Sequence, residues 1–461
     1  MSYFPSARTC SAVLVSFFCS GAALSQGSEQ TLPPENTLES LVPGGFSGPL
    51  ASVGQKLFDF GINLRLSMVN FTELNGSGNL TPWATANTAA LVIGTDFDLN
   101  KLLGMPGATI HVEETIFGLG VNQGVTHNFH SSVGSYAAGA PMPNNTGADY
   151  LSTLSYEQHA LANRLEFEVG RLNPVRAFNQ FNCDNLLTCQ NPISQFTANM
   201  PPPPFSSWGS RLKYTVAPPY FVQLGAYEDH ISNAMKTDGF NFSTNAATGA
   251  LLLLEVGRQT NFAQSHYPST YTMVAFRDTS RQTDPANRSL HEAGTGGYVF
   301  QAQQVLWRAD DGVARSTPAH YFAGFTTLAF TPDHYAPFSS YADLGVNYYG
   351  IFSNRPQDHI GLKATYIQDS TNELIYQENS RVAAGGPKVK TSPNQMRFEL
   401  SATFDIWHGI TFQPSIQYDV NPDTWYNVKV AKVPTDGFVF GTVINIPLGN
   451  LLGLSRPNSP L

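Results

Sequence analysis

The feature that most constrains the fold is an alternation of apolar and polar residues with a period of two. The pattern begins at Leu57, and between Phe58 and Met68 every second residue is apolar, whereas Asp59, Asn63 and Arg65 lie between them. A β-strand sends successive side chains to opposite faces, and a helix cannot sort this pattern. The alternation recurs in about fifteen segments of roughly ten residues, the length that a tilted transmembrane strand needs. The sequence therefore predicts an all-β protein.

Composition separates a membrane barrel from a soluble β-sandwich. Charged residues make up 13% of the chain and aromatic residues 12%, against about 25% charged residues in soluble domains. The polar faces of a sandwich would carry more Lys and Glu than this. The aromatic content excludes a disordered chain, and the apolar runs after residue 25 are too short for a helical membrane span. The net charge of −9 argues against a nucleic-acid partner.

Closure of the sheet follows from the hydrocarbon environment. An open sheet edge would leave N–H and C=O groups unpaired in lipid, so the strands must form a closed antiparallel barrel. About 400 residues at roughly 25 per strand and loop give 16 strands, with 18 as the alternative. Short turns such as Val216–Pro219 alternate with long polar stretches such as Gly118–Asp149, which we interpret as long extracellular loops.

The remaining segments are assigned from local composition. Residues 1–25 resemble a secretory signal peptide, with Arg8 as the only charge before a short apolar core and small residues around Ala23. Residues 26–50 are predicted to be a periplasmic leader, 51–448 the barrel and 449–461 a C-terminal tail. Of the four cysteines, Cys183 and Cys189 remain after cleavage and are predicted to form a disulfide in this exported protein.

Several motifs resemble the carbohydrate-selective porins of the OprB family, over about Gly45 to Leu448. The most specific stretches are Ala323–Pro332 and Leu344–Gly361, and the second ends in an Arg-x-x-Asp-x-x-Gly turn at Arg355 and Asp358. Phe97–Gly104, Val169–Arg171 and Phe412–Pro422 are similar to the family as well. The resemblance implies a passive channel of about 16 strands through the outer membrane of a Gram-negative bacterium, which favours monosaccharides such as glucose.

A barrel of this size encloses water, so the polar strand faces are expected to line a channel. Sugar hydroxyls pair with charged and amide groups, and sugar C–H faces lie against aromatic rings. The residues that the alternation assigns to the lumen, and that we take as candidates to line the pore or contact sugar, are Arg65, His111, Glu113, Glu166, Glu168, Arg211, Lys213, Glu255, Gln303, Trp307 and Glu399. Gln301 falls on the same face.

These residues also have structural interpretations. Arg65 and Arg211 could pair with a carboxylate on a neighbouring strand to stabilise the wall, and Arg355 with Asp358 could cap a turn. Trp307 would lie in the outer aromatic girdle if the register slips by one residue. The stretch 178–208 is long enough to fold inward as a constriction, but an exposed loop is an equal alternative.

Two other functions fit parts of the pattern. Glu166 and Glu168 would lie about 7 Å apart on one strand face, within the range used by sugar-cleaving enzymes, but no motif of a hydrolase or a phosphate-binding loop accompanies them. A structural or adhesive barrel would need the same wall. We predict a channel rather than an enzyme, without cofactor or metal, whose partners are a monosaccharide and outer-membrane lipid; self-association is left open.

Overall fold

The computed structural model describes residues 45–117, 125–136, 149–178, 185, 187–189, 191–229, 239–245, 247–312, 317–353 and 355–456, with backbone only at 125–128. The predicted signal peptide, most of the leader and Cys183 lie outside these residues. Among the described residues no helix is long and apolar enough to cross a membrane.

Sixteen antiparallel strands form one closed barrel, as the alternation predicted. Each strand pairs with its neighbours in the sequence, and β1 pairs with β16 to close the ring, with Met68 opposite Ile446. The strands are β1 (Ile62–Asn75), β2 (Thr85–Asp98), β3 (Ala108–Phe117), β4 (Asp149–Ala160), β5 (Leu165–Leu172), β6 (Ser207–Ala217), β7 (Tyr220–Asp229), β8 (Gly249–Gln259), β9 (Ser269–Thr283), β10 (His291–Arg308), β11 (Tyr321–Phe330), β12 (Phe338–Tyr349), β13 (His359–Asp369), β14 (Asn394–Trp407), β15 (Ile410–Val420) and β16 (Gly437–Ile446).

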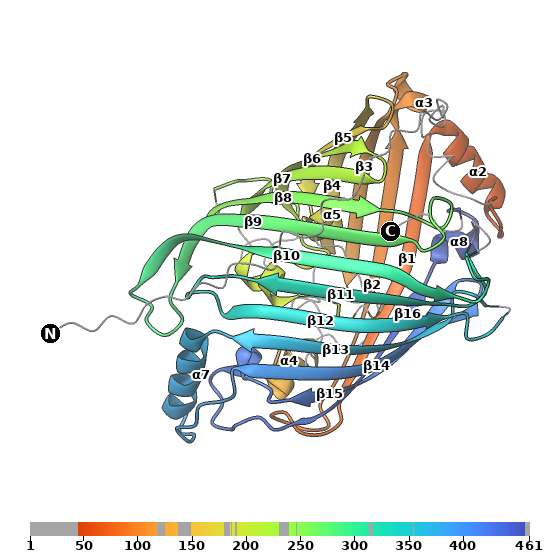
Figure 1. Cartoon of the computed structure of the whole chain (residues 1–461). Helices are drawn as coiled ribbons and strands as arrows, with labels where there is room; N and C mark the ends of the chain where they lie inside the picture. The colour runs from red at the N-terminus through yellow and green to blue at the C-terminus, as the bar shows by residue number, and fades with distance from the viewer. Residues whose placement is uncertain are drawn as a thin grey trace, which may run out of the picture. The chain divides into compact units, whose positions relative to one another are not determined.

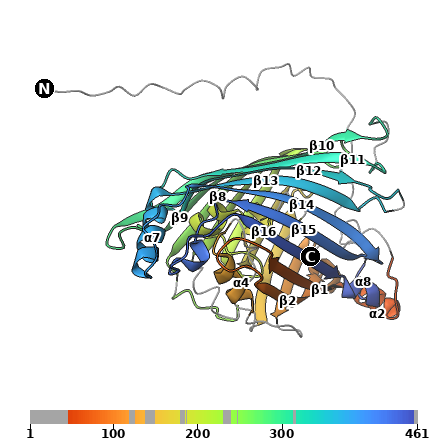
Figure 2. The same cartoon turned by 90° about the horizontal axis from the view of Figure 1, so that it is seen from below.

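The two ends of the barrel differ in their connections. At one end the turns are short, as between β6 and β7 and between β14 and β15, and this end carries α2 (Ala51–Phe60), α3 (Leu99–Leu103) and α8 (Leu448–Leu452). The other end carries the longer connections, with α4 (Val125–Val133) and α7 (Thr371–Ala383). Figures 1 and 2 show these helices grouped at the two ends of the strands. We call them the turn end and the loop end.

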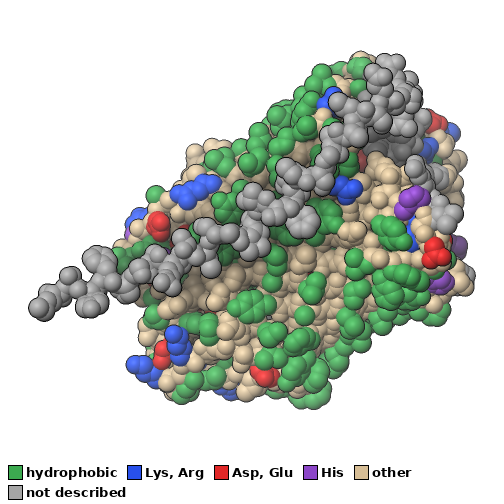
Figure 3. Space-filling view, viewed as in Figure 1, with side chains coloured by type: hydrophobic (Ala, Val, Ile, Leu, Met, Phe, Trp, Pro, Cys, Tyr) green, Lys and Arg blue, Asp and Glu red, His purple; other side chains and the backbone are tan. Residues whose placement is uncertain are grey.

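Alternation along each strand separates an apolar outer face from a polar inner face. On β8, Leu252, Leu254 and Val256 are 46%, 45% and 50% exposed, whereas Leu253 and Glu255 between them are buried. The face shown in Figure 3 is mostly hydrophobic or uncharged, with most charged side chains near its margins. In a bilayer this outer face contacts hydrocarbon and the inner face contacts water.

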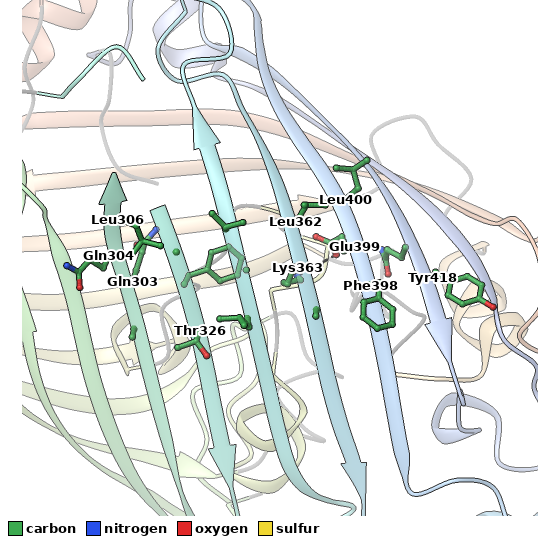
Figure 4. A pocket seen from close by; sticks show the side chains of 18 of the residues that line it. Gln303, Gln304, Leu306, Thr326, Leu362, Lys363, Phe398, Glu399, Leu400 and Tyr418 are labelled. Carbon is green, nitrogen blue, oxygen red and sulfur yellow. Dashed lines mark ion pairs between the residues drawn. The ribbon is translucent and has the colours of Figure 1, made fainter. Parts of the chain in front are cut away.

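The outer wall also carries an apolar trough of about 900 Å³ across β9–β16. Exposed side chains such as Leu306, Leu362 and Phe398 border it, as Figure 4 shows. Lys363 and Glu399, also labelled there, form an ion pair and are both buried on the inner side of the same strands. The trough therefore faces the lipid and does not belong to the channel.

The long connection between β5 and β6 folds into the barrel and reaches the opposite wall. The Thr188 carbonyl accepts hydrogen bonds from Lys363 Nζ on β13 at 3.0 Å and from Arg397 Nη2 on β14 at 3.1 Å. The Leu187 side chain packs against Val443 on β16. We call its described residues, within 173–206, the inward loop; they contain α5 (Val175–Phe178) and the π-helix η1 (Ile193–Thr197). The inward alternative for the stretch 178–208 is thus the correct one for its described part.

Two sequence expectations about strands were wrong. The alternation from Leu57 predicted a strand, but the structure forms helix α2 up to Phe60, and Gly61 ends it in the left-handed region at φ 101°. The Phe58 ring packs against Phe46 and under the Lys101 ammonium, contacts that a helix supplies at the barrel rim. Strand β4 was missed, because the structure places Ser152 as an extra residue between Leu151 and Thr153 and this β-bulge breaks the alternation.

We expect Leu254→Arg to lower the free energy of unfolding by about 2–4 kcal/mol, because it places a charge on the lipid face near the middle of β8. Urea titration of the barrel in lipid vesicles, followed by tryptophan fluorescence, measures this change. Gln301→Arg, on the inner face of β10, is the control and is expected to lower the free energy of unfolding much less. Equal losses for both variants would contradict the assignment of faces.

Candidate functional site: the polar lining of the lumen

Arg211 is the centre of a group of acidic side chains on adjacent strands. It lies on β6 directly opposite Glu168 of β5, and its Nε is 3.0 Å from Glu168 Oε2. Its Nη2 forms ion pairs with Glu166 of β5 and with Glu157 of β4, the latter at 3.2 Å. One guanidinium therefore holds three carboxylates on the inner wall.

A second group surrounds Arg65 on β1. Its two Nη atoms lie 3.1 Å from Asp96 of β2 and 3.1 Å from Glu113 of β3. Glu113 is fully buried and also pairs with Arg176 of the inward loop. Glu113 thus binds Arg65 of the wall and Arg176 of the inward loop at once, and this shared carboxylate attaches the loop to the wall.

His111 connects the two groups. Its Nδ1 is 2.9 Å from Asp96 Oδ1, and its Nε2 is 3.9 Å from Glu157 Oε2. We call the connected set the lumenal charge network: Arg65, Asp96, His111, Glu113, Glu157, Glu166, Glu168, Arg176 and Arg211. Within it five carboxylates face three guanidiniums, so the set carries a small negative charge while its histidine is neutral.

Two water-accessible cavities adjoin the network. The larger, of about 420 Å³, is lined by Arg65, His111, Arg211 and other network residues and by Arg176 and Asn173 of the inward loop. The smaller, of about 150 Å³, is lined by Glu255, Gln303 and other side chains of β6–β10. Lys213, Gln223 and Ala177 line both cavities. The α5 part of the inward loop therefore lies between two adjoining polar spaces.

The structure brings most of the candidate residues together but not all. Six of them belong to the charge network, and Lys213, Glu255 and Gln303 line the smaller cavity. Glu399 is separate, because it lies on β14 with its Oε2 3.5 Å from Lys363 Nζ, where the inward loop meets the opposite wall. The candidates that share the network are Arg65, His111, Glu113, Glu166, Glu168 and Arg211.

The prediction that Trp307 faces the lumen was wrong. The pairing of β10 with β11 shifts between Val305 and Trp307, where Leu306 is the additional residue. This bulge reverses the alternation, so that Trp307 is 45% exposed with its ring 5.8 Å from Phe322 on the outer face. The residue lies near the turn end, where an interfacial aromatic girdle is expected.

Arg355 and Asp358 lie in the turn between β12 and β13, away from the charge network. Arg355 Nη2 is 2.9 Å from Asp358 Oδ2, and the buried Asp358 carboxylate also accepts a hydrogen bond from the Asp405 N–H. This geometry links two neighbouring turns at the turn end. Cys189 is disulfide-bonded, while Cys183 lies outside the described residues, so the pairing of these two remains a prediction.

Four important residues were not among the candidates. Asp96 shares the alternation of β2 and could have been chosen as a partner of Arg65. Glu157 lies on the missed strand β4, and Arg176 lies on a loop that has no periodic pattern. Gln223 lies on the polar face of the alternating segment Tyr220–Tyr227 and could have been chosen as Gln303 was; its amide contacts both Arg211 and Glu255.

At the loop end, α7 is attached to the segment before the 3₁₀ helix η2 (Trp425–Asn427) through a buried polar contact. Gln377 Nε2 donates to Glu373 Oε1 at 3.0 Å and to Asp423 Oδ2 at 3.1 Å. Burial and the nearby Asp423 carboxylate raise the pKa of Glu373 to about 7, and burial raises the pKa of Asp423 to about 6. These contacts connect α7 to the segment before η2 at the loop end, apart from the charge network.

A closed barrel with an apolar outer face and a charged, water-accessible lumen defines a porin-type channel. The family model described as "Carbohydrate-selective porin, OprB family" matches residues 84–446. The chain belongs to this family, as the sequence motifs indicated, and is a carbohydrate-selective porin of the Gram-negative outer membrane.

Individual proteins agree with this assignment. The chain is 25% identical over 407 residues to Porin B of Pseudomonas aeruginosa, which covers 82% of this chain and 86% of that protein. It is 26% identical over 277 residues to the putative porin QuiX of Acinetobacter baylyi, covering 56% of this chain and 62% of that one. A high-pH structure of Pseudomonas putida OprB has the same fold, with a TM-score of 0.74 and 21% identity over 88% of this chain and 98% of that chain.

We expect Arg211→Ala to raise the cation-to-anion permeability ratio about twofold or more, because three carboxylates lose their shared guanidinium in a confined space. Glu113→Gln removes a negative charge from the same network and should shift the ratio in the opposite direction. Reversal potentials across a planar bilayer under a salt gradient measure the ratio.

Arg277→Ala, on the outer face of β9, is the matched control, and the heat-dependent gel mobility of each variant reports folding. If Arg211→Ala and Glu113→Gln both retain the wild-type ratio, the charge network does not line the ion path.

Proposed function

We propose that this porin passes neutral monosaccharides such as glucose by passive diffusion, with the lumenal charge network as its constriction. The observation that carries the proposal is that the arginines of the network form ion pairs with its carboxylates. Arg65, Arg176 and Arg211 each bind carboxylates on the wall. Such a lining offers many strong hydrogen-bonding groups and a weak net field, which suits a solute with hydroxyls and no charge.

The inward loop supports the same proposal. It enters the lumen next to the network, and Arg176 is bonded to Glu113 on the wall. The space beside it measures about 420 Å³, within the range of sites that take small molecules. A passage of this size would admit a single sugar ring more readily than a longer saccharide.

An enzymatic role has less support. Glu166 and Glu168, the pair that a sugar-cleaving enzyme would use, both bind the one guanidinium of Arg211. They therefore act as wall contacts within the network, instead of facing each other across a substrate. The OprB family consists of porins, which are channels.

Purified protein in planar bilayers should give small conductance steps that millimolar glucose reduces, because a sugar in the constriction displaces ions. Single-channel recordings at increasing glucose concentrations measure the reduction, with the sugar-free salt solution adjusted to equal viscosity as the control. Conductance steps whose size does not change with glucose would contradict monosaccharide passage through the constriction, although the barrel would still be a porin.

A further inference from the structure

The smaller cavity is lined mainly by uncharged hydrogen-bonding groups, in contrast to the charge network beside it. Gln223 on β7 and Gln301 and Gln303 on β10 contribute amides, and Thr270 and Thr272 on β9 contribute hydroxyls. The cavity measures about 150 Å³. We call it the amide chamber.

Gln223 joins the chamber to the charge network in a fixed orientation. Its Nε2 donates to Glu255 Oε2 at 2.9 Å and to the Ala177 carbonyl of the inward loop at 3.1 Å. Its Oε1 accepts from Arg211 Nη1 at 3.2 Å. The Gln223 amide therefore separates the guanidinium from the chamber, and an uncharged group forms the boundary between the two spaces.

Gln303 is the amide best placed to bind a solute. It is half-buried on the chamber wall, and its side chain makes no hydrogen bond to another residue in the part of the chain that the structure describes. An amide offers two N–H donors and a carbonyl acceptor, and a sugar hydroxyl is both donor and acceptor. Adjacent hydroxyls of a pyranose can therefore use the Gln303 donors and acceptor together.

Phe221 and Lys213 form the edge of the chamber. The Phe221 ring crosses Gly257 of the neighbouring strand so closely that a Cβ at Gly257 would lie 2.4 Å from the Phe221 Cζ atom. Lys213 Nζ lies 4.7 Å from the centre of the same ring, held by a cation–π interaction. The glycine thus makes room for the ring, and the ring holds the ammonium where it can donate to a solute hydroxyl.

We propose that the amide chamber is a binding site for one neutral pyranose during its passage, a site separate from the charged constriction. This inference rests on the proposed monosaccharide passage and adds where the sugar is bound. The chamber supplies affinity through amides and hydroxyls, whereas the charge network sets ion preference. Glu255 and Lys213 both line the chamber, so their opposite charges largely cancel. A sugar carboxylate would lose its hydration there without a net positive field to replace it, and an uncharged ring is therefore preferred.

The two properties can be separated by substitution. Gln303→Met keeps the size of the side chain and removes its hydrogen-bonding groups, so we expect the dissociation constant for glucose block to rise about threefold to tenfold. The cation-to-anion permeability ratio should stay at the wild-type value, since no charge is changed. Glucose titration of single-channel current and reversal potentials measure the two quantities.

Gln304→Met is the matched control, because Gln304 is the next residue on β10, labelled beside Gln303 in Figure 4, and its side chain bonds to Tyr271 on the outer face. Glucose should block the Gln304→Met channel with the same dissociation constant as the wild-type channel. Thr272→Val, which removes one hydroxyl from the same chamber, provides a second test if Gln303→Met does not fold, and it should also weaken the block.

The outcomes distinguish the two proposals. If glucose blocks Gln303→Met and Thr272→Val with the same dissociation constant as the wild type, the amide chamber is not a sugar site, and the proposal of monosaccharide passage is unaffected. A wild-type channel that no sugar blocks would overturn both. Block of equal strength by glucose and glucuronate would contradict the selection for an uncharged ring.

Discussion

The structure depends on the closure of its backbone hydrogen bonds in a medium that offers no others. An unpaired N–H or C=O in hydrocarbon costs several kcal/mol, so an open edge on β1 or β16 could not persist there. Pairing of Met68 with Ile446 and of its neighbours closes the ladder. Closure in turn fixes an inside and an outside for every strand, and this division assigns the few charges of the chain to the lumen and the ends.

The charges inside the barrel are arranged in pairs across neighbouring strands. Arg211 can hold Glu166, Glu168 and Glu157 together because β4, β5 and β6 are adjacent in the ring. The inward loop continues this arrangement, since Arg176 shares Glu113 with Arg65. Wall, loop and lumen lining are therefore one connected polar structure, and its small net field is compatible with an uncharged solute.

The sequence predicted the fold well because a period of two needs only local information. It predicted the inner face at Arg65, His111 and Glu113 for the same reason. Two of the failures occur where one extra residue breaks the period. The bulge at Ser152 concealed β4 and with it Glu157, and the bulge at Leu306 turned Trp307 outward. The position of Arg176 depends on how a long loop crosses the lumen, which no strand pattern encodes.

The central claim is that the lumen selects small uncharged sugars through paired charges and amides. Liposome swelling with a series of saccharides tests it most directly, since it measures solute flux without an applied voltage. Glucose should enter faster than a disaccharide, and also faster than glucuronate of similar size. Equal rates for glucose and glucuronate, or rates indifferent to saccharide length, would contradict the claim.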